Sequence, residues 1–118
     1  LVATLFAARR DTSAALAHYE RAIALDPKDA VARHSLAYLL GREGLDLRHA
    51  VSLSREATRL EPTSATYQNT LSWLLLKLGD HDAAERAALR AIELAPENAL
   101  YRAGLAAIQE AREGVAQP

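Results

Sequence analysis

The chain contains neither cysteine nor methionine, and it has only one phenylalanine and one tryptophan. The lack of cysteine excludes disulfides, thiolate chemistry and cysteine-ligated metals. No apolar run approaches the roughly 18 residues that a membrane span needs, so we expect no membrane insertion. Because the chain starts at Leu1 and has no methionine, we expect it to be a piece of a longer protein.

A surplus of charge of either sign is also missing. Lys and Arg number 14 against 15 Asp and Glu, for a net charge of −1. Nucleic-acid binders normally show a basic surplus, so we expect no nucleic-acid partner, and helical repeats that read RNA are disfavoured. The compartment is not readable from cysteine usage, although a cytoplasmic location is favoured. The bias towards alanine and arginine suggests a bacterium with a GC-rich genome.

The residues that are abundant favour helices. Leucine, alanine and arginine dominate, and β-branched residues are few, so no strand is predicted. Half of the 118 residues are hydrophobic, which is enough for one continuous core.

Three segments repeat along the chain: AHYERAIALDPKDA (17–30), SREATRLEPTSA (54–65) and ALRAIELAPENA (88–99). Their prolines, Pro27, Pro62 and Pro96, are 35 and 34 residues apart. The extra residue of the middle unit lies in the turn 45–47, where an insertion costs little. Small residues also align, as at Ala37 and Ser72, and they let crossing helices approach closely.

Each unit is predicted to be a pair of helices, because apolar residues recur at steps of three and four. We expect helices over 1–9, 12–25, 29–42, 47–60, 64–78, 81–94 and 98–113, followed by a tail at 114–118. Glycines should end the first helix of a pair, and Asp, Ser or Asn side chains should cap the following helices. These residues are Gly44, Gly79, Asp29, Asp46, Ser64, Asp80 and Asn98.

In this register the sequence resembles the tetratricopeptide repeat family, most clearly over NTLSWLLLKLGDHDAAERAALRAIELAPEN (69–98). The resemblance implies an all-α fold, a right-handed superhelical α-solenoid of antiparallel helix pairs. It implies one domain over 1–113, with a truncated first repeat at 1–28, repeats at 29–63 and 64–97, and a covering helix at 98–113. The usual aromatic residues are replaced at Ser54, Ala88, Arg33 and Gln68.

The resemblance also implies a concave groove lined by the first helix of each pair. Its predicted partner-binding residues are His34, Tyr38, Arg42, Thr66, Asn69, Trp73, Lys77 and Leu100. Aromatic rings could bury apolar side chains, Asn69 could pair with a peptide backbone, and Arg42 or Lys77 could hold a carboxylate. The alternative is that Tyr38 and Trp73 pack between helices, and that Arg42 and Lys77 are ordinary solvated helix ends.

Other sites have little support in the sequence. The two-carboxylate clamp of chaperone-binding relatives is absent, since its positions hold residues such as His34, Tyr38 and Thr70. His81 and Glu85 have the spacing of a metal pair, but they lie at a helix start where capping explains the nearby acids better. We therefore expect no catalytic residues, no metal and no cofactor.

The favoured function is a non-catalytic protein-interaction scaffold that binds a partner peptide or helix in its groove. Self-association is an alternative, because a truncated first helix would leave an apolar edge at Val2, Leu5 and Phe6 that could form a homo-oligomer. A regulatory segment of a larger enzyme is a third hypothesis, and nothing in the sequence separates it from the first.

Overall fold

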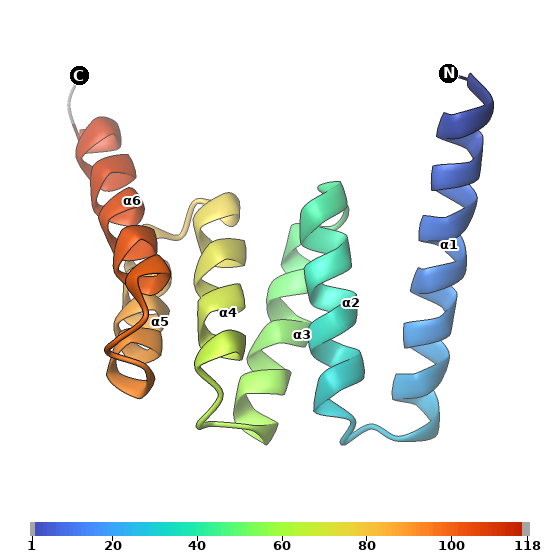
Figure 1. The fold of residues 1–118 in the computed structure, drawn as a ribbon, viewed down its shortest axis with the longest axis horizontal. Helices are drawn as coiled ribbons and strands as arrows, with labels where there is room; N and C mark the ends of the chain where they lie inside the picture. The colour runs from blue at the N-terminus through green and yellow to red at the C-terminus, as the bar shows by residue number, and fades with distance from the viewer. Residues whose placement is uncertain (1, 117–118) are drawn as a thin grey trace.

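A computed structural model describes the backbone of residues 2–116 and the side chains of residues 11–114. That part of the chain forms six helices and no strand (Figure 1). They are α1 (Val2–Leu25), α2 (Ala30–Glu43), α3 (Leu47–Leu60), α4 (Ala65–Leu78), α5 (His81–Leu94) and α6 (Ala99–Ala116). The prediction of an all-α helical repeat solenoid is confirmed.

The helices stand in two rows. Helices α2, α4 and α6 form an inner row, in which α2 contacts α4 and α4 contacts α6. Helices α3 and α5 form an outer row behind it (Figure 1). Within the described residues α3 and α5 do not contact each other. Because inner helices touch and outer helices do not, the stack is curved, with α2, α4 and α6 on its concave side.

Side-chain caps begin the helices where the sequence predicts them. The carboxylates of Asp29, Asp46 and Asp80 accept from the backbone N–H three residues later, at 3.0, 3.2 and 3.2 Å. Ser64 does the same for α4 at 3.2 Å, and Asn98 accepts from the first turn of α6. Each cap satisfies an N–H that the helix leaves unpaired.

Two glycines end α2 and α4 of the inner row. Gly44 and Gly79 have φ of 67° and 92°, a left-handed conformation that glycine adopts without strain. Their N–H groups bond back to carbonyls of the preceding turn, as in Gly79 to Leu75 and Leu76. The chain then reverses into the outer row within a few residues.

The core lies where the two rows meet. Small residues at the helix crossings are fully buried, namely Ala37, Ala50, Ala57, Ala84 and Ala91. Ser72 belongs to the same set, and its Oγ donates to the carbonyl of Ala84 at 3.0 Å. Ala106 stands in the same column but is exposed, because the described chain places no helix over it.

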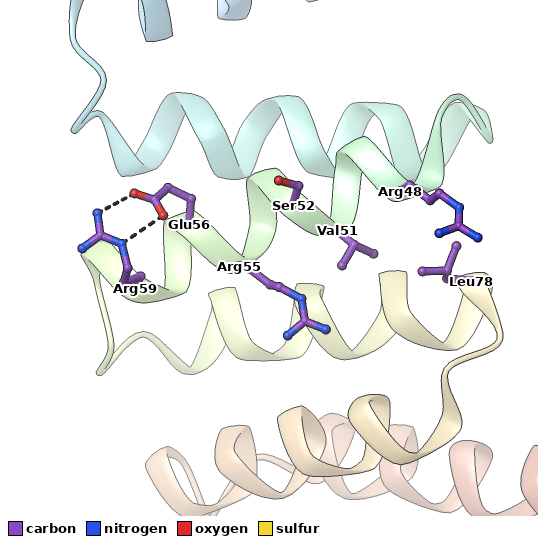
Figure 2. A pocket seen from close by; sticks show the side chains of 7 residues that line it. All are labelled: Arg48, Val51, Ser52, Arg55, Glu56, Arg59 and Leu78. Atoms are coloured by element: carbon purple, nitrogen blue, oxygen red, sulfur yellow. Dashed lines mark hydrogen bonds and ion pairs between the residues drawn. The ribbon is translucent and has the colours of Figure 1, made fainter.

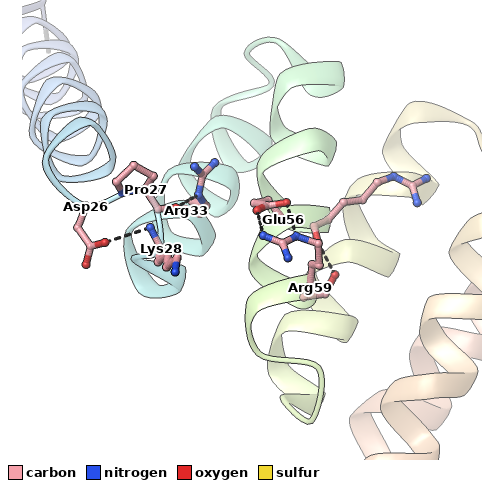
Figure 3. A network of polar contacts seen from close by, with 8 residues as sticks. Asp26, Pro27, Lys28, Arg33, Glu56 and Arg59 are labelled. Carbon is pink, nitrogen blue, oxygen red and sulfur yellow. Dashed lines mark hydrogen bonds and ion pairs between the residues drawn. The ribbon is translucent and has the colours of Figure 1, made fainter.

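Arginine side chains form hydrogen bonds across two of the turns between units, and the sequence alone did not indicate them. Arg33 Nε donates to the carbonyl of Pro27 at 2.9 Å, across the turn that joins α1 to α2 (Figure 3). Arg102 of α6 donates from its terminal guanidinium nitrogen Nη1 to the carbonyl of Pro96, which lies in the turn before α6. Position 33, where the resemblance implies an aromatic residue, thus holds an arginine that bonds back across the turn.

The predicted break between helices at 1–9 and 12–25 is wrong, since α1 runs unbroken from Val2 to Leu25. Arg10 stands where later units have Gly44 and Gly79, and a non-glycine residue disfavours the left-handed turn that would end the helix. At the other end α6 continues to Ala116 instead of ending at 113. The apolar edge expected at Val2, Leu5 and Phe6 lies outside the residues whose side chains are described.

Candidate functional site

The concave face carries a row of aromatic rings that crosses from α2 to α4. His34 stacks on Tyr67 with ring centroids 4.5 Å apart and lies 6.5 Å from Tyr38. Tyr38 in turn lies 5.6 Å from Trp73, and Lys77 Nζ sits 4.8 Å from the centre of the Trp73 ring. We call these four rings and Lys77 the ladder. A cation over an aromatic face is attracted by the ring quadrupole, and this attraction holds Lys77 against Trp73.

His34 is fixed at the ladder by a second contact. Its Nε2 lies 2.9 Å from Oγ1 of Thr70, a buried residue of α4. Partial burial lowers the pKa of His34 because desolvation disfavours the charged imidazolium. Burial and the carboxylates of Glu61 and Asp29 raise the pKa of the Tyr67 hydroxyl. Both shifts favour the uncharged forms of His34 and Tyr67, whereas the cation Lys77 stands at the other end of the ladder.

Trp73 belongs both to the surface and to the packing of the inner row. It is half-buried and lies against Gly41 of α2, where an added Cβ would come within 2.9 Å of its ring. The Nζ of Lys77 lies over the same ring. Tyr38 is 47% exposed and remains open to solvent. Tyr38 is thus the more exposed of the two aromatic residues, and Trp73 is the more enclosed.

A hollow of about 270 Å³ adjoins the ladder on its α1 side. His34, Tyr38 and Arg42 line one wall, and Tyr19 of α1 lies on the other. Arg42 is exposed, and its ion pair with Glu43 is 3.3 Å long. The hollow extends the aromatic surface towards the first helix, so a ligand on the ladder would also meet a cation there.

The structure brings some of the predicted groove residues together and leaves others apart. His34, Tyr38, Trp73 and Lys77 form the ladder, and Arg42 lies beside it. Asn69 is half-buried near Gly104 of α6. Thr66 is exposed and Leu100 is 79% exposed, and neither contributes a ring or a cation to the ladder.

Sequence reasoning missed Tyr67 and Gly41. Tyr67 stands between Thr66 and Asn69 of the predicted stripe, and the steps of three and four that define the stripe leave it out. Gly41 resembled an ordinary residue near a helix end, yet it is buried within α2. Its signal in the sequence was a glycine three residues before the glycine that ends the helix.

Two acids in the first turns of α5, Asp82 and Glu85, pair with the last helix. Arg112 of α6 binds Asp82 at 2.6 Å and Glu85 at 2.9 Å, which ties the last helix to the outer row. No group of three or more metal-ligating side chains occurs among the described residues. Of the helices that the structure describes, none has both the length and the apolar character of a membrane span.

Comparison with known proteins agrees with the geometry. A sequence model of the tetratricopeptide repeat matches residues 65–98. No curated protein matches the chain. A Thermobaculum terrenum O-GlcNAc transferase mutant is 28% identical with a TM-score of 0.76, over 83% of this chain and 19% of the transferase.

Two further solved structures share the fold. MamA is 22% identical with a TM-score of 0.83, over 90% of this chain and 61% of MamA. The first TPR of Spaghetti (RPAP3), bound to an HSP90 peptide, is 19% identical with a TM-score of 0.82, over 93% of this chain and 86% of that one. The chain thus spans about a fifth of the transferase and about three fifths of MamA.

Proposed function

We propose that the chain is non-catalytic and binds a segment of a partner protein on the ladder. The chain is a tetratricopeptide repeat protein, and this fold is typical of protein–protein interaction modules. The observation that carries the proposal is the ladder itself. Four rings and a cation are aligned on the concave face, and Tyr38 leaves nearly half of its surface open. Aromatic faces open to solvent are typical anchors for apolar side chains.

The ladder favours a segment with an apolar side chain and a nearby acidic group. The rings of Tyr38 and Trp73 would take the apolar part. Arg42 and Lys77, both exposed, would meet the carboxylate, and Asn69 would pair with the segment's backbone. Peptide binding by this fold is supported by Spaghetti with its HSP90 peptide and by YrrB, described as a TPR protein with an unusual peptide-binding site.

The test is affinity purification from the source organism's lysate with three baits: the wild type, a Tyr38→Ala/Asn69→Ala variant and a Leu89→Ala control. Leu89 lies on the outer row and is 48% exposed. Leu89→Ala therefore removes a side chain as exposed as that of Tyr38, but from a position away from the ladder. We expect a partner that the wild type and the control retain and that the double variant loses. Trp73 is not used as the primary variant because it also packs on Gly41.

Two results would contradict the proposal. If all three baits hold the same proteins equally, the ladder is not the binding surface. If each bait recovers only its own parent protein, self-association becomes the leading function and the rings become packing residues.

A regulatory segment of a larger enzyme is the second candidate, favoured by the stack's likeness to one fifth of an O-GlcNAc transferase. It requires a parent protein much larger than 12.8 kDa. An antibody against this chain, used on a denaturing gel of source lysate, would measure that mass. A parent of the chain's own size would remove this candidate.

A further inference from the structure

Three arginines lie along one line on the outer row. Arg48, Arg55 and Arg59 of α3 recur at steps of seven and four, which places them on one helical face with Ser52 between them. All of them are exposed, and the opposite face of α3 is buried through Ala50, Leu53 and Ala57. We call the three residues the arginine stripe. It faces away from the ladder, because α3 belongs to the outer row.

The arginine stripe borders a hollow of about 490 Å³ (Figure 2). Val51 of α3 and Leu78 at the end of α4 supply apolar carbon to its lining. Figure 2 shows Arg48 beside Leu78, and Arg55 extending over α4. The hollow thus combines an apolar lining with guanidinium groups at its rim.

The charges of the stripe are only partly compensated. Arg59 binds Glu56 through two hydrogen bonds of 2.9 and 2.5 Å (Figures 2 and 3). The hydrogen bond from Arg59, with the charges of Arg59 and Arg33, lowers the pKa of Glu56 below its ordinary value. The guanidinium groups of Arg48 and Arg55 make no ion pair with any acid in the described part of the chain.

The internal repeat shows that folding does not require these arginines. With Ala15, Ala50 and Ala84 in register, the stripe can be compared with the same three positions on α5 and α1. Those positions hold Asp82, Leu89 and Glu93 on α5, and Ser13, Glu20 and Ala24 on α1. The same helix pair therefore forms with acidic, apolar or small residues there. The stripe is a property of the surface of one unit and not of the repeat.

We propose that the arginine stripe is a second docking site, which binds an acidic segment of a partner protein on the face opposite the ladder. Guanidinium groups pair with carboxylates through two parallel hydrogen bonds, and Arg48 and Arg55 are available for this. An apolar side chain of the segment would rest on Val51 and Leu78. The site stands independently of the function proposed for the ladder.

Length and charge argue for an acidic peptide over a nucleic acid. From Arg48 to Arg59 the helix rises about 16 Å, which about five residues of extended peptide span. The chain as a whole has a net charge of −1, so no broad basic surface surrounds the three arginines.

The test measures fluorescence anisotropy of a labelled peptide in which pairs of glutamates alternate with leucines, titrated with the full chain. A matched peptide with glutamine for glutamate tests the need for charge. The variant is Arg48→Gln/Arg55→Gln. The control is Arg21→Gln/Arg86→Gln, which removes the same charge from exposed positions outside the stripe. We expect the variant to bind about tenfold more weakly and the control to match the wild type.

Backbone amide chemical shifts of the labelled chain locate the bound peptide, and circular dichroism confirms that every variant is folded. Perturbations centred on α3 support the proposal. It is overturned if the wild type shows no saturable binding, if both double variants weaken equally, or if the shifts centre on the ladder. Tighter binding of an oligothymidine through the same arginines would replace the peptide with a nucleic acid and would also overturn it.

Discussion

Gly41 is the residue on which the close approach of α2 and α4 depends. A Cβ at this position would meet the Trp73 ring at 2.9 Å and would lie closer still to Leu74. Because both neighbours belong to the packed inner row, Gly41→Ala should lower the free energy of unfolding by about 1–3 kcal/mol. Urea denaturation followed by circular dichroism measures the change.

Gly114 provides the control for this substitution. It lies in α6 with open space around it, so Gly114→Ala should be neutral or should raise stability by up to about 1 kcal/mol through better helix propensity. Equal effects of the two substitutions would mean that the inner row can separate without cost.

His34 makes stability depend on pH. Its pKa is lowered in the folded chain by burial, so the unfolded chain binds the proton more readily. The stabilising contribution is fully present above the ordinary pKa of 6.5 and is lost as pH falls through the lowered value. His34→Gln should therefore flatten the fall in melting temperature between neutral and mildly acidic pH. Parallel curves for both proteins would contradict this account.

At the scale of elements, the turn before α3 differs from the turn before α5. It holds one extra residue, and its capping Asp46 has φ of 40°, whereas Asp80 caps α5 with φ of −88°. Aspartate tolerates the left-handed region better than alanine does. Asp80→Ala should cost about 1 kcal/mol through the lost cap, and Asp46→Ala should cost more because it adds backbone strain.

Asp46→Gly isolates the two contributions. It removes the cap but fits the positive φ, so its loss of stability should be smaller than that of Asp46→Ala. Melting temperatures of the three variants give the order. If Asp46→Gly and Asp46→Ala lose the same stability, the cap and not the backbone strain dominates this turn.

The helices and turns of the later units could be predicted because their signals are local. Gly44, Gly79 and the capping side chains act on their own turns, and the aligned small residues indicate the crossings. Helix α1 was predicted less well, because residue 10 carries no stop signal and alignment with Gly44 alone suggested a break. The hydrogen bond from Arg33 to the carbonyl of Pro27 was missed, because it depends on how a long side chain folds back over a turn.

The candidate site was predictable only as a stripe. Spacing placed His34 and Tyr38 on one face of α2, and Trp73 and Lys77 on one face of α4. The stacking of Tyr67 on His34 depends on how far α4 is rotated against α2. That rotation is set by packing at Gly41 and Thr70, which helical periodicity does not describe.

At the scale of the whole molecule, the helices differ in how many neighbouring helices they contact. Helix α4 contacts α2, α3, α5 and α6, whereas within the described residues α1 contacts α2 alone. Stacked units are stabilised mainly by their neighbours, so the end helix should open first. Amide hydrogen exchange should be fastest in α1 and slowest in α4. Uniform exchange across the six helices would show that the stack unfolds only as one unit.

Because α3 and α5 do not contact each other within the described residues, we expect the curved stack to resist further bending more than straightening. Sharper curvature would press α2 into α4, where Gly41 leaves no room even for a methyl group. Flattening would bring α3 and α5 closer together, and these two helices make no contact within the described residues. We therefore expect straightening to be easier than further bending. Straightening would widen the concave side and narrow the space beside the arginine stripe. A ligand held in the hollow beside the arginine stripe would keep the stack curved.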